Sequence, residues 1–211
     1  FMASVDDLSI LVQGRGGHAA HPDRLADPVI ASGALLVALQ HLAGRISPPT
    51  VPSVLSIGKV IADGATNIVP DTVSLLGTFR TLSDEWREAA KTEIPRIARE
   101  VTAAYGCTAE VKIRRGYPSL SNDPVLTDRA QGAAAALPWV EGTSEPSITL
   151  GGEDFAYYAG VIPGCFYHLG VWEASRADAP EPLHSPRLLA SDRAIPLGAA
   201  TMAALALSLL E

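Results

Sequence analysis

Cysteine, aromatic residues and charged residues are all scarce in this chain. Its 211 residues include two cysteines, Cys107 and Cys165, which do not make a disulfide framework, so we expect a reducing, cytoplasmic setting. Aromatic residues make up 6% of the chain and charged residues 18%. Hydrophobic residues make up 47%, so the chain can bury a substantial core and is not a disordered tail.

Basic residues are outnumbered, and the sequence shows neither a leader pattern nor a membrane-span pattern. Lys and Arg number 16 against 23 Asp and Glu, and this acidic balance repels phosphates, so we expect no nucleic acid partner. The opening FMASVDDLSI has neither a basic nor an apolar region of a signal peptide. The apolar stretch from Ala194 to Leu210 is short for a membrane span and contains Pro196, so we expect no membrane partner.

The common motifs of nucleophilic and nucleotide-binding enzymes are also missing. The sequence contains no G-x-S-x-G, no P-loop, no C-x-x-C and no G-x-G-x-x-G after a strand pattern. Spacing and composition therefore reach no further than an α/β protein of unstated activity.

The first half alternates strand and helix patterns. Asp27 and Pro28 are typical of a helix N-cap and first turn, and Ser83 begins a second helical pattern. Together the patterns predict β-α-β-β-α-β over residues 7–115, which is a ferredoxin-like arrangement. The expected strands are 7–13, 51–61, 72–81 and 107–114, and the expected helices are about 27–45 and 83–105.

The second half has fewer strands. Its pattern predicts helices at 125–137 and 192–210 and apolar strands at 147–150 and 164–169. Two strands make a poor sheet, so we expect this half to be part of a larger α/β unit.

His18 is the first candidate for chemistry. It follows three glycines in GRGGHAAHP, where bare backbone lets a ligand approach closely and the imidazole can serve an oxyanion or a proton transfer. The alternative is an exposed loop histidine. His18 and His21 also have the i, i+3 spacing of a metal pair on a helix, but the glycines and Pro22 disfavour a regular helix.

Asn67 and Arg80 are further candidates. Asn67 lies in the turn DGATNIVPD, where its amide either points into a cleft or satisfies its own backbone. Arg80 ends an apolar strand in GTFRT, and its guanidinium either extends to solvent or clamps a carboxylate.

Two motifs in the second half complete the candidates. In GGEDF, Glu153 and Asp154 follow a strand pattern, and they either line a ligand site or cap a helix N-terminus. In LHSP, His184 suits a metal, but one histidine cannot hold an ion and a plain loop residue is the alternative.

Taken in order, GRGGHAAHPDRLADPV, DGATNIVPD with GTFRT, GGEDFAYY and LHSP resemble the metal-dependent amidohydrolases of the M20 peptidase family, in the hippurate hydrolase and N-acyl-amino-acid amidohydrolase group. This resemblance implies a ferredoxin-like lid or dimerisation domain at residues 1–115. It implies that residues 116–211 are the C-terminal portion of an α/β catalytic domain like that of zinc peptidases. The opening portion, which supplies most metal ligands and the general base, would lie outside this sequence.

The resemblance also assigns roles by position. His184 matches a metal ligand, and His18 matches a lid histidine that polarises the scissile carbonyl in the partner's active site. Asn67 matches a lid asparagine that assists the same oxyanion, and Arg80 an arginine that grips the substrate carboxylate. A loop lining the pocket is matched by Gly151, Gly152 and Glu153. Relatives often have Pro-His where this chain has Pro22-Asp23, a difference at the pocket edge.

The implied reaction is hydrolysis of the amide bond of an N-acyl amino acid by water bound to one or two divalent ions (Zn, Mn, Co or Ni). The implied assembly is a homodimer through the lid. The competing interpretation is a catalytically inactive fragment that only dimerises, because the chain offers one metal ligand and no identified base.

Overall fold

The computed structural model describes residues 2–173 and 180–210. The chain forms two compact units. Unit 1 comprises Phe1–Ser121 and Ile148–Tyr157, and unit 2 comprises Asn122–Ser147 and Tyr158–Glu211. The predicted division into residues 1–115 and 116–211 stays a prediction about family domains.

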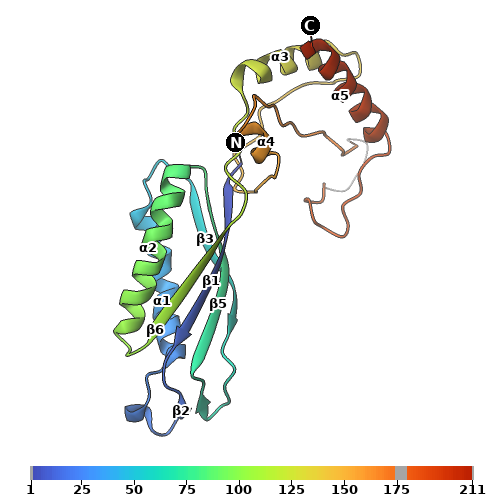
Figure 1. Cartoon of the computed structure of the whole chain (residues 1–211). Helices are drawn as coiled ribbons and strands as arrows, with labels where there is room; N and C mark the ends of the chain where they lie inside the picture. The colour runs from blue at the N-terminus through green and yellow to red at the C-terminus, as the bar shows by residue number, and fades with distance from the viewer. Residues whose placement is uncertain (1, 174–179, 211) are drawn as a thin grey trace. The chain divides into compact units, whose positions relative to one another are not determined.

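Unit 1 is built on a four-stranded sheet in which every neighbouring pair is antiparallel (Figure 1). The strand order is β3-β5-β1-β6. The order of strands and helices along the chain is the predicted β-α-β-β-α-β, with a small extra ribbon. The strands are β1 (Ser4–Gln13), β3 (Ser53–Ile61), β5 (Thr72–Thr81) and β6 (Thr108–Arg115).

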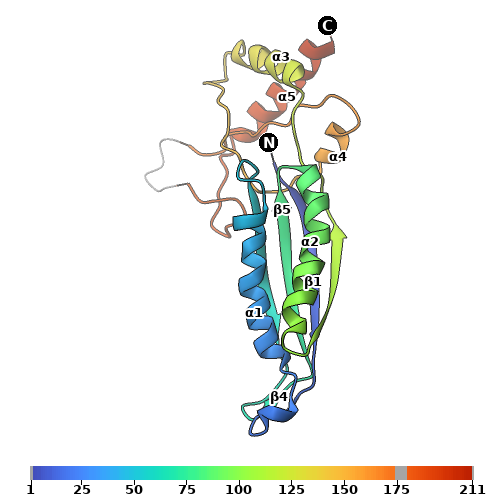
Figure 2. The ribbon, with the colours of Figure 1, turned by 90° about the vertical axis from the view of Figure 1, so that its left-hand side faces the viewer.

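Helices α1 (Pro28–His41) and α2 (Asp84–Ala103) lie on the same side of the sheet (Figure 2). Alternate residues of β1 are buried, and they pack with both helices into one core, because successive side chains of a strand point to opposite faces. This core includes Leu8, Ile10, Val12, Leu35, Leu39, Phe79, Ile94 and Ala98.

The predicted helix starts are confirmed. The Asp27 side chain accepts hydrogen bonds from the backbone of Val29 and Ile30, and the Ser83 side chain accepts one from Trp86. A π-helical segment, Leu42–Ile46, extends α1. By length and composition alone, Pro28–Ile46 is apolar enough to cross a membrane, with a mean hydropathy of 1.5. Its buried residues pack against the sheet, as those of a core helix do.

A two-stranded ribbon extends unit 1 beyond one end of the sheet (Figure 1). It pairs β2 (Gly17–His18) with β4 (Ile68–Val69), and a 3-10 turn, Pro22–Arg24, follows β2. We call these two short strands the β2–β4 ribbon.

Unit 2 contains two longer helices, α3 (Pro124–Ala135) and α5 (Ala194–Leu210), close to the predicted positions. They pack on one another, and Trp139 Nε1 donates a hydrogen bond to Thr201 Oγ1 at 3.0 Å. A short helix, α4 (Ala156–Ala159), lies where the two units meet in sequence.

The predicted strands at 147–150 and 164–169 are wrong. Thr149 makes only an isolated bridge, with Met2, and the segment 164–169 contains no strand. In that segment the backbone of Phe166 pairs with the side-chain amide of Asn122, at 2.8 and 2.9 Å. A strand needs a neighbouring strand for its hydrogen bonds, and these segments find none among the described residues.

Candidate functional site

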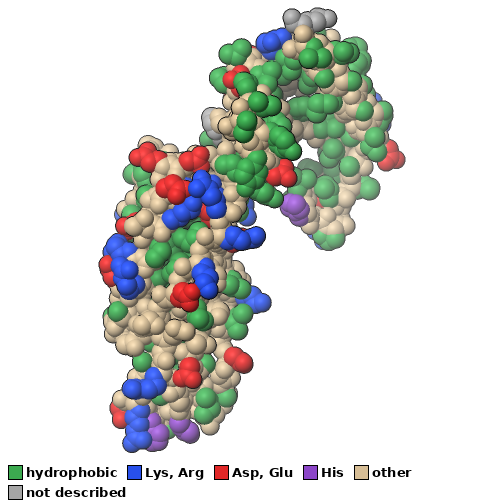
Figure 3. Space-filling view, viewed as in Figure 1, with side chains coloured by type: hydrophobic (Ala, Val, Ile, Leu, Met, Phe, Trp, Pro, Cys, Tyr) green, Lys and Arg blue, Asp and Glu red, His purple; other side chains and the backbone are tan. Residues whose placement is uncertain are grey.

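His18 lies on the β2–β4 ribbon with its side chain exposed to solvent. Its Nδ1 accepts a hydrogen bond from the backbone N–H of Ala20 at 3.1 Å. An Nδ1 that accepts must be unprotonated in the neutral ring, so the proton sits on Nε2, which can donate to another group. Histidine side chains are visible at this end of unit 1 in Figure 3. The rings of His18 and His21 lie 5.8 Å apart.

Asn67 lies next to the residue that pairs with His18 across the ribbon. The backbone N–H of Ala19 donates to the carbonyl of Asn67 at 3.0 Å, and His18 pairs with Ile68. The side chains of His18 and Asn67 are exposed. The structure therefore brings these two predicted residues together although 48 others separate them in sequence.

Arg80 lies near the other end of the sheet, where it contacts the glycine loop of GGEDF. Its Nη1 donates to the carbonyl of Leu150 at 3.0 Å. The loop itself is held against β1: the backbone N–H of Ala3 donates to Gly151 O at 2.9 Å. A Cβ at Gly152 would lie 2.3 Å from Cγ2 of Val5, so only glycine fits this approach. Arg80 and the loop are thus a second pair that the structure brings together.

Glu153 acts locally as a helix cap. Its Oε1 accepts from the backbone N–H of Phe155 at 3.3 Å, and its carbonyl accepts from Ala156 at 3.3 Å, at the start of α4. This capping was one of the two interpretations of GGEDF, and a carboxylate in the first turn also suits the helix dipole.

The two pairs lie at opposite ends of the sheet. In the β1–β5 register Gln13 faces Thr72, next to the ribbon, and Val5 faces Arg80. Eight residue steps along the strand separate these positions, which corresponds to about 27 Å at the usual rise per residue. Within one chain, His18 therefore cannot reach a ligand held by Arg80.

His184, in unit 2, has an unusual backbone. Its φ is 68°, and it is the one non-glycine residue with positive φ among the described positions. Histidine pays a conformational cost there, and such strained positions cluster at functional sites. Within residues 2–173 and 180–210, no group of three or more His, Cys, Asp or Glu side chains could hold a metal ion.

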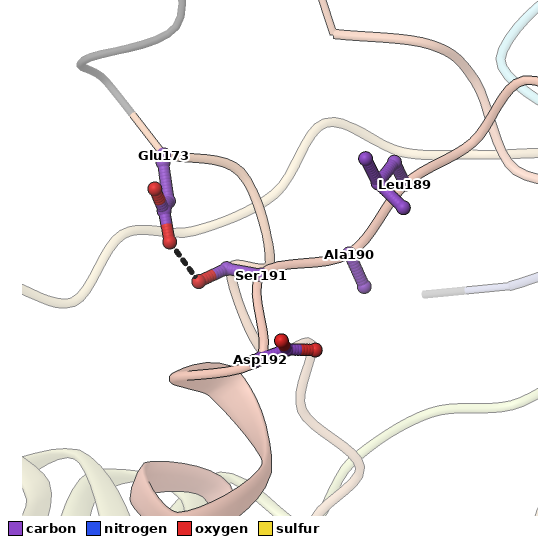
Figure 4. A pocket seen from close by; sticks show the side chains of 5 residues that line it. All are labelled: Glu173, Leu189, Ala190, Ser191 and Asp192. Carbon is purple, nitrogen blue, oxygen red and sulfur yellow. Dashed lines mark hydrogen bonds between the residues drawn. The ribbon is translucent and has the colours of Figure 1, made fainter.

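Shallow hollows lie among the described residues of both units. One, of about 220 Å³ in unit 2, is lined by Glu173, Leu189, Ala190, Ser191 and Asp192, and the Ser191 hydroxyl donates to the Glu173 carboxylate (Figure 4). None of the predicted site residues lines it. The other, of about 510 Å³, adjoins the β2–β4 ribbon and is lined by Gly16, Gly17, Asp63, Ile68, Val69, Pro70, Asp71 and Thr72. The second hollow is therefore the one that lies near His18 and Asn67.

Sequence reasoning missed two polar groups that shape unit 1. Asp6 and Arg87 form a buried ion pair, and their separation in sequence leaves no local signal. Burial by itself would raise the pKa of Asp6, but the hydrogen bonds from Arg87 and the Gly116 amide, with the Arg87 charge, lower it below its ordinary value. Asp71 was part of the quoted turn DGATNIVPD but had no role assigned.

Comparisons with known proteins identify the family of hydrolases to which these motifs belong. The model of peptidase family M20/M25/M40 matches residues 11–208, so this chain belongs to that family. It is 35% identical over 210 residues to N-acetylcysteine deacetylase of Bacillus subtilis, covering 100% of this chain and 53% of that protein. It is also 35% identical to the N-acetyl-L-cysteine deacetylase of the same organism, covering 92% of this chain and 45% of that protein.

A solved structure gives the same result. The Bacillus subtilis protein YXEP, described as a dinuclear metal binding peptidase from the M20 family, matches with a TM-score of 0.75 and 32% identity. The match covers 98% of this chain and 50% of YXEP. The chain thus spans about half the length of the relatives it matches.

Proposed function

We propose that the complete protein is a metal-dependent amidohydrolase that cleaves the amide bond of N-acyl amino acids. Membership of the M20 family supports amide hydrolysis as the reaction class. Two relatives named as N-acetylcysteine deacetylases support an N-acyl amino acid as the substrate class. We also propose that the substrate carries a hippurate-like acyl group and that the protein works in the cytoplasm.

The observation that carries the substrate class is the contact of Arg80 with the loop at Leu150. Among the described residues, the Arg80 guanidinium makes this one hydrogen bond, so its other N–H groups can bind a carboxylate. A partly buried arginine fixed at one N–H is preorganised for a bidentate contact with the substrate carboxylate. The pocket wall beside it would be formed by Gly151, Gly152 and Glu153.

His18 and Asn67 would act on the substrate carbonyl. The Nε2–H of His18 and the side-chain amide of Asn67 are both hydrogen-bond donors, and donors aimed at a developing oxyanion stabilise the transition state. Because both lie beyond the end of the sheet that is about 27 Å from Arg80, we propose that they serve the site of a partner subunit. A complete site would then combine Arg80 of one chain with His18 of another.

The dimer that this requires would form through β3 and α1. β3 is one edge of the sheet, and Val60 and Ile61 near its end are exposed. Ile30 and Val37 form an exposed apolar face on α1. The opposite edge, β6, carries exposed charges of the kind that protect an edge from pairing, including Glu110, Lys112, Arg114 and Arg115. The chain resembles a ferredoxin-like lid in this proposal, and its strand order β3-β5-β1-β6 supports that fold.

The metal site is incomplete within the described residues. His184 would supply one ligand, but zinc sites need three or four protein ligands and no such group is present in residues 2–173 and 180–210. The described residues therefore do not fit a complete metal centre. The roles proposed for Arg80, His18 and Asn67 do not depend on which ion completes it.

The test is hydrolysis of a panel of N-acyl amino acids by the purified complete protein, before and after dialysis against a chelator. We expect hydrolysis that is lost with the metal, and a His18→Ala variant whose kcat falls about a hundredfold with little change in KM. A kcat within about threefold of the unsubstituted protein would refute the transition-state role of His18. No hydrolysis of any substrate by the metal-loaded protein would favour the inactive, dimerising fragment, which the incomplete metal site also favours.

A further inference from the structure

Asp71 lies at the junction between the main sheet and the β2–β4 ribbon. The β1–β5 pairing ends at Gln13 and Thr72, and Asp71 is the next residue toward the ribbon. Its carbonyl accepts a hydrogen bond from the backbone N–H of Gly14 at 2.9 Å. Its side-chain Oδ1 accepts a second one from the N–H of Gly16 at 2.8 Å. Asp71 thus binds, through backbone and side chain, the segment that leads to His18.

Three of the four residues in that segment are glycines, and close contacts or backbone geometry disfavour a side chain at each of them. A Cβ at Gly14 would lie 2.1 Å from the carbonyl oxygen of Ala26, and a Cβ at Gly16 would lie 2.2 Å from that of Val69. Gly17 has a φ of +148°, which L side chains rarely adopt. The backbone here packs directly on backbone, so hydrogen bonds rather than side-chain packing decide where the segment lies.

The segment before the β2–β4 ribbon is also held by backbone hydrogen bonds between Arg15 and Ala26 and by the Arg15 side chain, which donates to the Arg24 carbonyl, whereas the ribbon itself is small. It consists of two residue pairs, Gly17 with Val69 and His18 with Ile68, and its side chains are mostly exposed. A two-stranded ribbon is marginally stable by itself. Its attachment to the sheet therefore depends on the junction, where the carboxylate of Asp71 accepts a hydrogen bond from the backbone N–H of Gly16 in the glycine segment.

We infer that Asp71 is a positioning residue for His18 and Asn67. Its carboxylate fixes Gly16, two residues before His18, while its own chain continues back through Pro70 to Asn67. A single residue therefore links the two strands that carry the candidate oxyanion donors. A hydrogen bond to an ionised acceptor is about twice as strong as a neutral one, which suits an anchor at an exposed position. This inference rests on the proposed function of His18 but concerns a different residue and a separate measurement.

The first measurement is hydrogen exchange of the Gly16 amide, followed by NMR in the purified protein. We expect Asp71→Ala to speed exchange at Gly16 about tenfold, because the amide loses its acceptor. Asp71→Asn keeps an oxygen acceptor and should retain most of the protection. The matched control is Asp63→Ala, which removes the same charge from the same hollow, where the structure records no hydrogen bond or ion pair between Asp63 and the described residues. Unchanged exchange at Gly16 in Asp71→Ala would overturn the inference.

The second measurement is steady-state hydrolysis by the metal-loaded protein. We expect Asp71→Ala to lower kcat about tenfold with KM within about twofold and the melting temperature within about 2 °C, since the residue acts through His18 and not on folding. Asp71→Asn should recover most of kcat, and Asp63→Ala should leave it unchanged. If His18→Ala is impaired but Asp71→Ala is not, the positioning role is wrong. If His18→Ala retains full kcat, the proposed function of His18 fails, and the exchange result still decides whether Asp71 anchors its segment.

Discussion

Arg87 on α2 donates two hydrogen bonds to the carboxylate of Asp6 on β1, from Nε to Oδ2 at 2.8 Å and from Nη2 to Oδ1 at 2.5 Å. Both side chains are fully buried. Gly116, which follows β6, joins the same group: its N–H donates to Asp6 Oδ1 and its carbonyl accepts from Arg87 Nη2, both at 3.1 Å. One ion pair therefore ties the start of β1 and the start of α2 to the point where the chain leaves the sheet.

Replacing either partner alone should destabilise unit 1. Asp6→Leu or Arg87→Met leaves a buried charge without its partner, which typically costs about 3–5 kcal/mol of unfolding free energy. The double variant removes both charges, so we expect it to lose less than the sum of the single losses. Urea unfolding followed by Trp86 fluorescence, with Trp139 and Trp172 replaced by phenylalanine, measures this. Strictly additive losses would show that the pair is not energetically coupled.

The same pair should make unit 1 sensitive to acid. The pKa of Asp6 in the folded protein lies below its ordinary value of 3.8, because the bonds from Arg87 and Gly116 and the Arg87 charge outweigh the opposing effect of burial. A lowered folded pKa means that stability is fully present above the unfolded pKa and is lost as the pH falls through the folded one. We expect unfolding free energy to fall below about pH 4, and to fall less in the Asp6→Leu/Arg87→Met variant. If the unsubstituted protein and the double variant lose the same unfolding free energy in acid, other carboxylates cause the effect.

The left-handed backbone of His184 predicts a stability change of unusual sign. Glycine adopts a φ of 68° without the penalty that a side chain carries, so His184→Gly should stabilise unit 2 by about 1 kcal/mol. The neighbouring exposed Leu183 is the control, because glycine there should cost stability instead. Thermal unfolding followed by Trp139 fluorescence compares the two. If His184 is also a metal ligand, His184→Gly will bind less divalent metal in a dialysis assay. A loss of stability in His184→Gly would contradict the backbone strain at this position.

A site shared between two chains predicts complementation. His18→Ala and His184→Ala should each be inactive as homodimers. In a mixed dimer, one site would combine the intact His184 of the His18→Ala chain with the intact His18 of the His184→Ala chain. Random mixing gives half mixed dimers, so we expect roughly a quarter of full activity after the two variants are co-expressed. Mixing Asn67→Ala with His18→Ala is the control: both changes affect the same ribbon, so no site regains both donors. Absence of recovery in the first mixture would place His18 in its own chain's site.

Local patterns in the sequence predicted much of unit 1. The alternation along β1, the Asp27–Pro28 start of α1 and the Ser83 cap of α2 depend on residues close in the chain, and each element formed where its pattern indicates. The glycines before His18 predicted close approach of a ligand; in the structure Gly14 and Gly16 approach the backbone of Ala26 and Val69.

Sequence patterns failed where an element depends on a distant partner. The apolar segments 147–150 and 164–169 have the composition of strands, but no strand lies beside them among the described residues to take their hydrogen bonds. Composition indicates that a segment is suited to a β-sheet, but it does not indicate whether a neighbouring strand is available for pairing.

The amino-acid sequence by itself determined the order of elements, their caps and the residue types available for chemistry, because these follow from periodicity and local hydrogen bonding. Only the tertiary structure decided which of those residues meet. The antiparallel register of the ribbon puts His18 close to Asn67, a side-chain hydrogen bond joins Arg80 to Leu150, and the sheet register places these two pairs toward opposite ends of one sheet. It also buries Arg87 against Asp6, a contact between residues far apart in the chain. Such contacts are set by strand pairing and packing across the whole unit, and no local pattern records them.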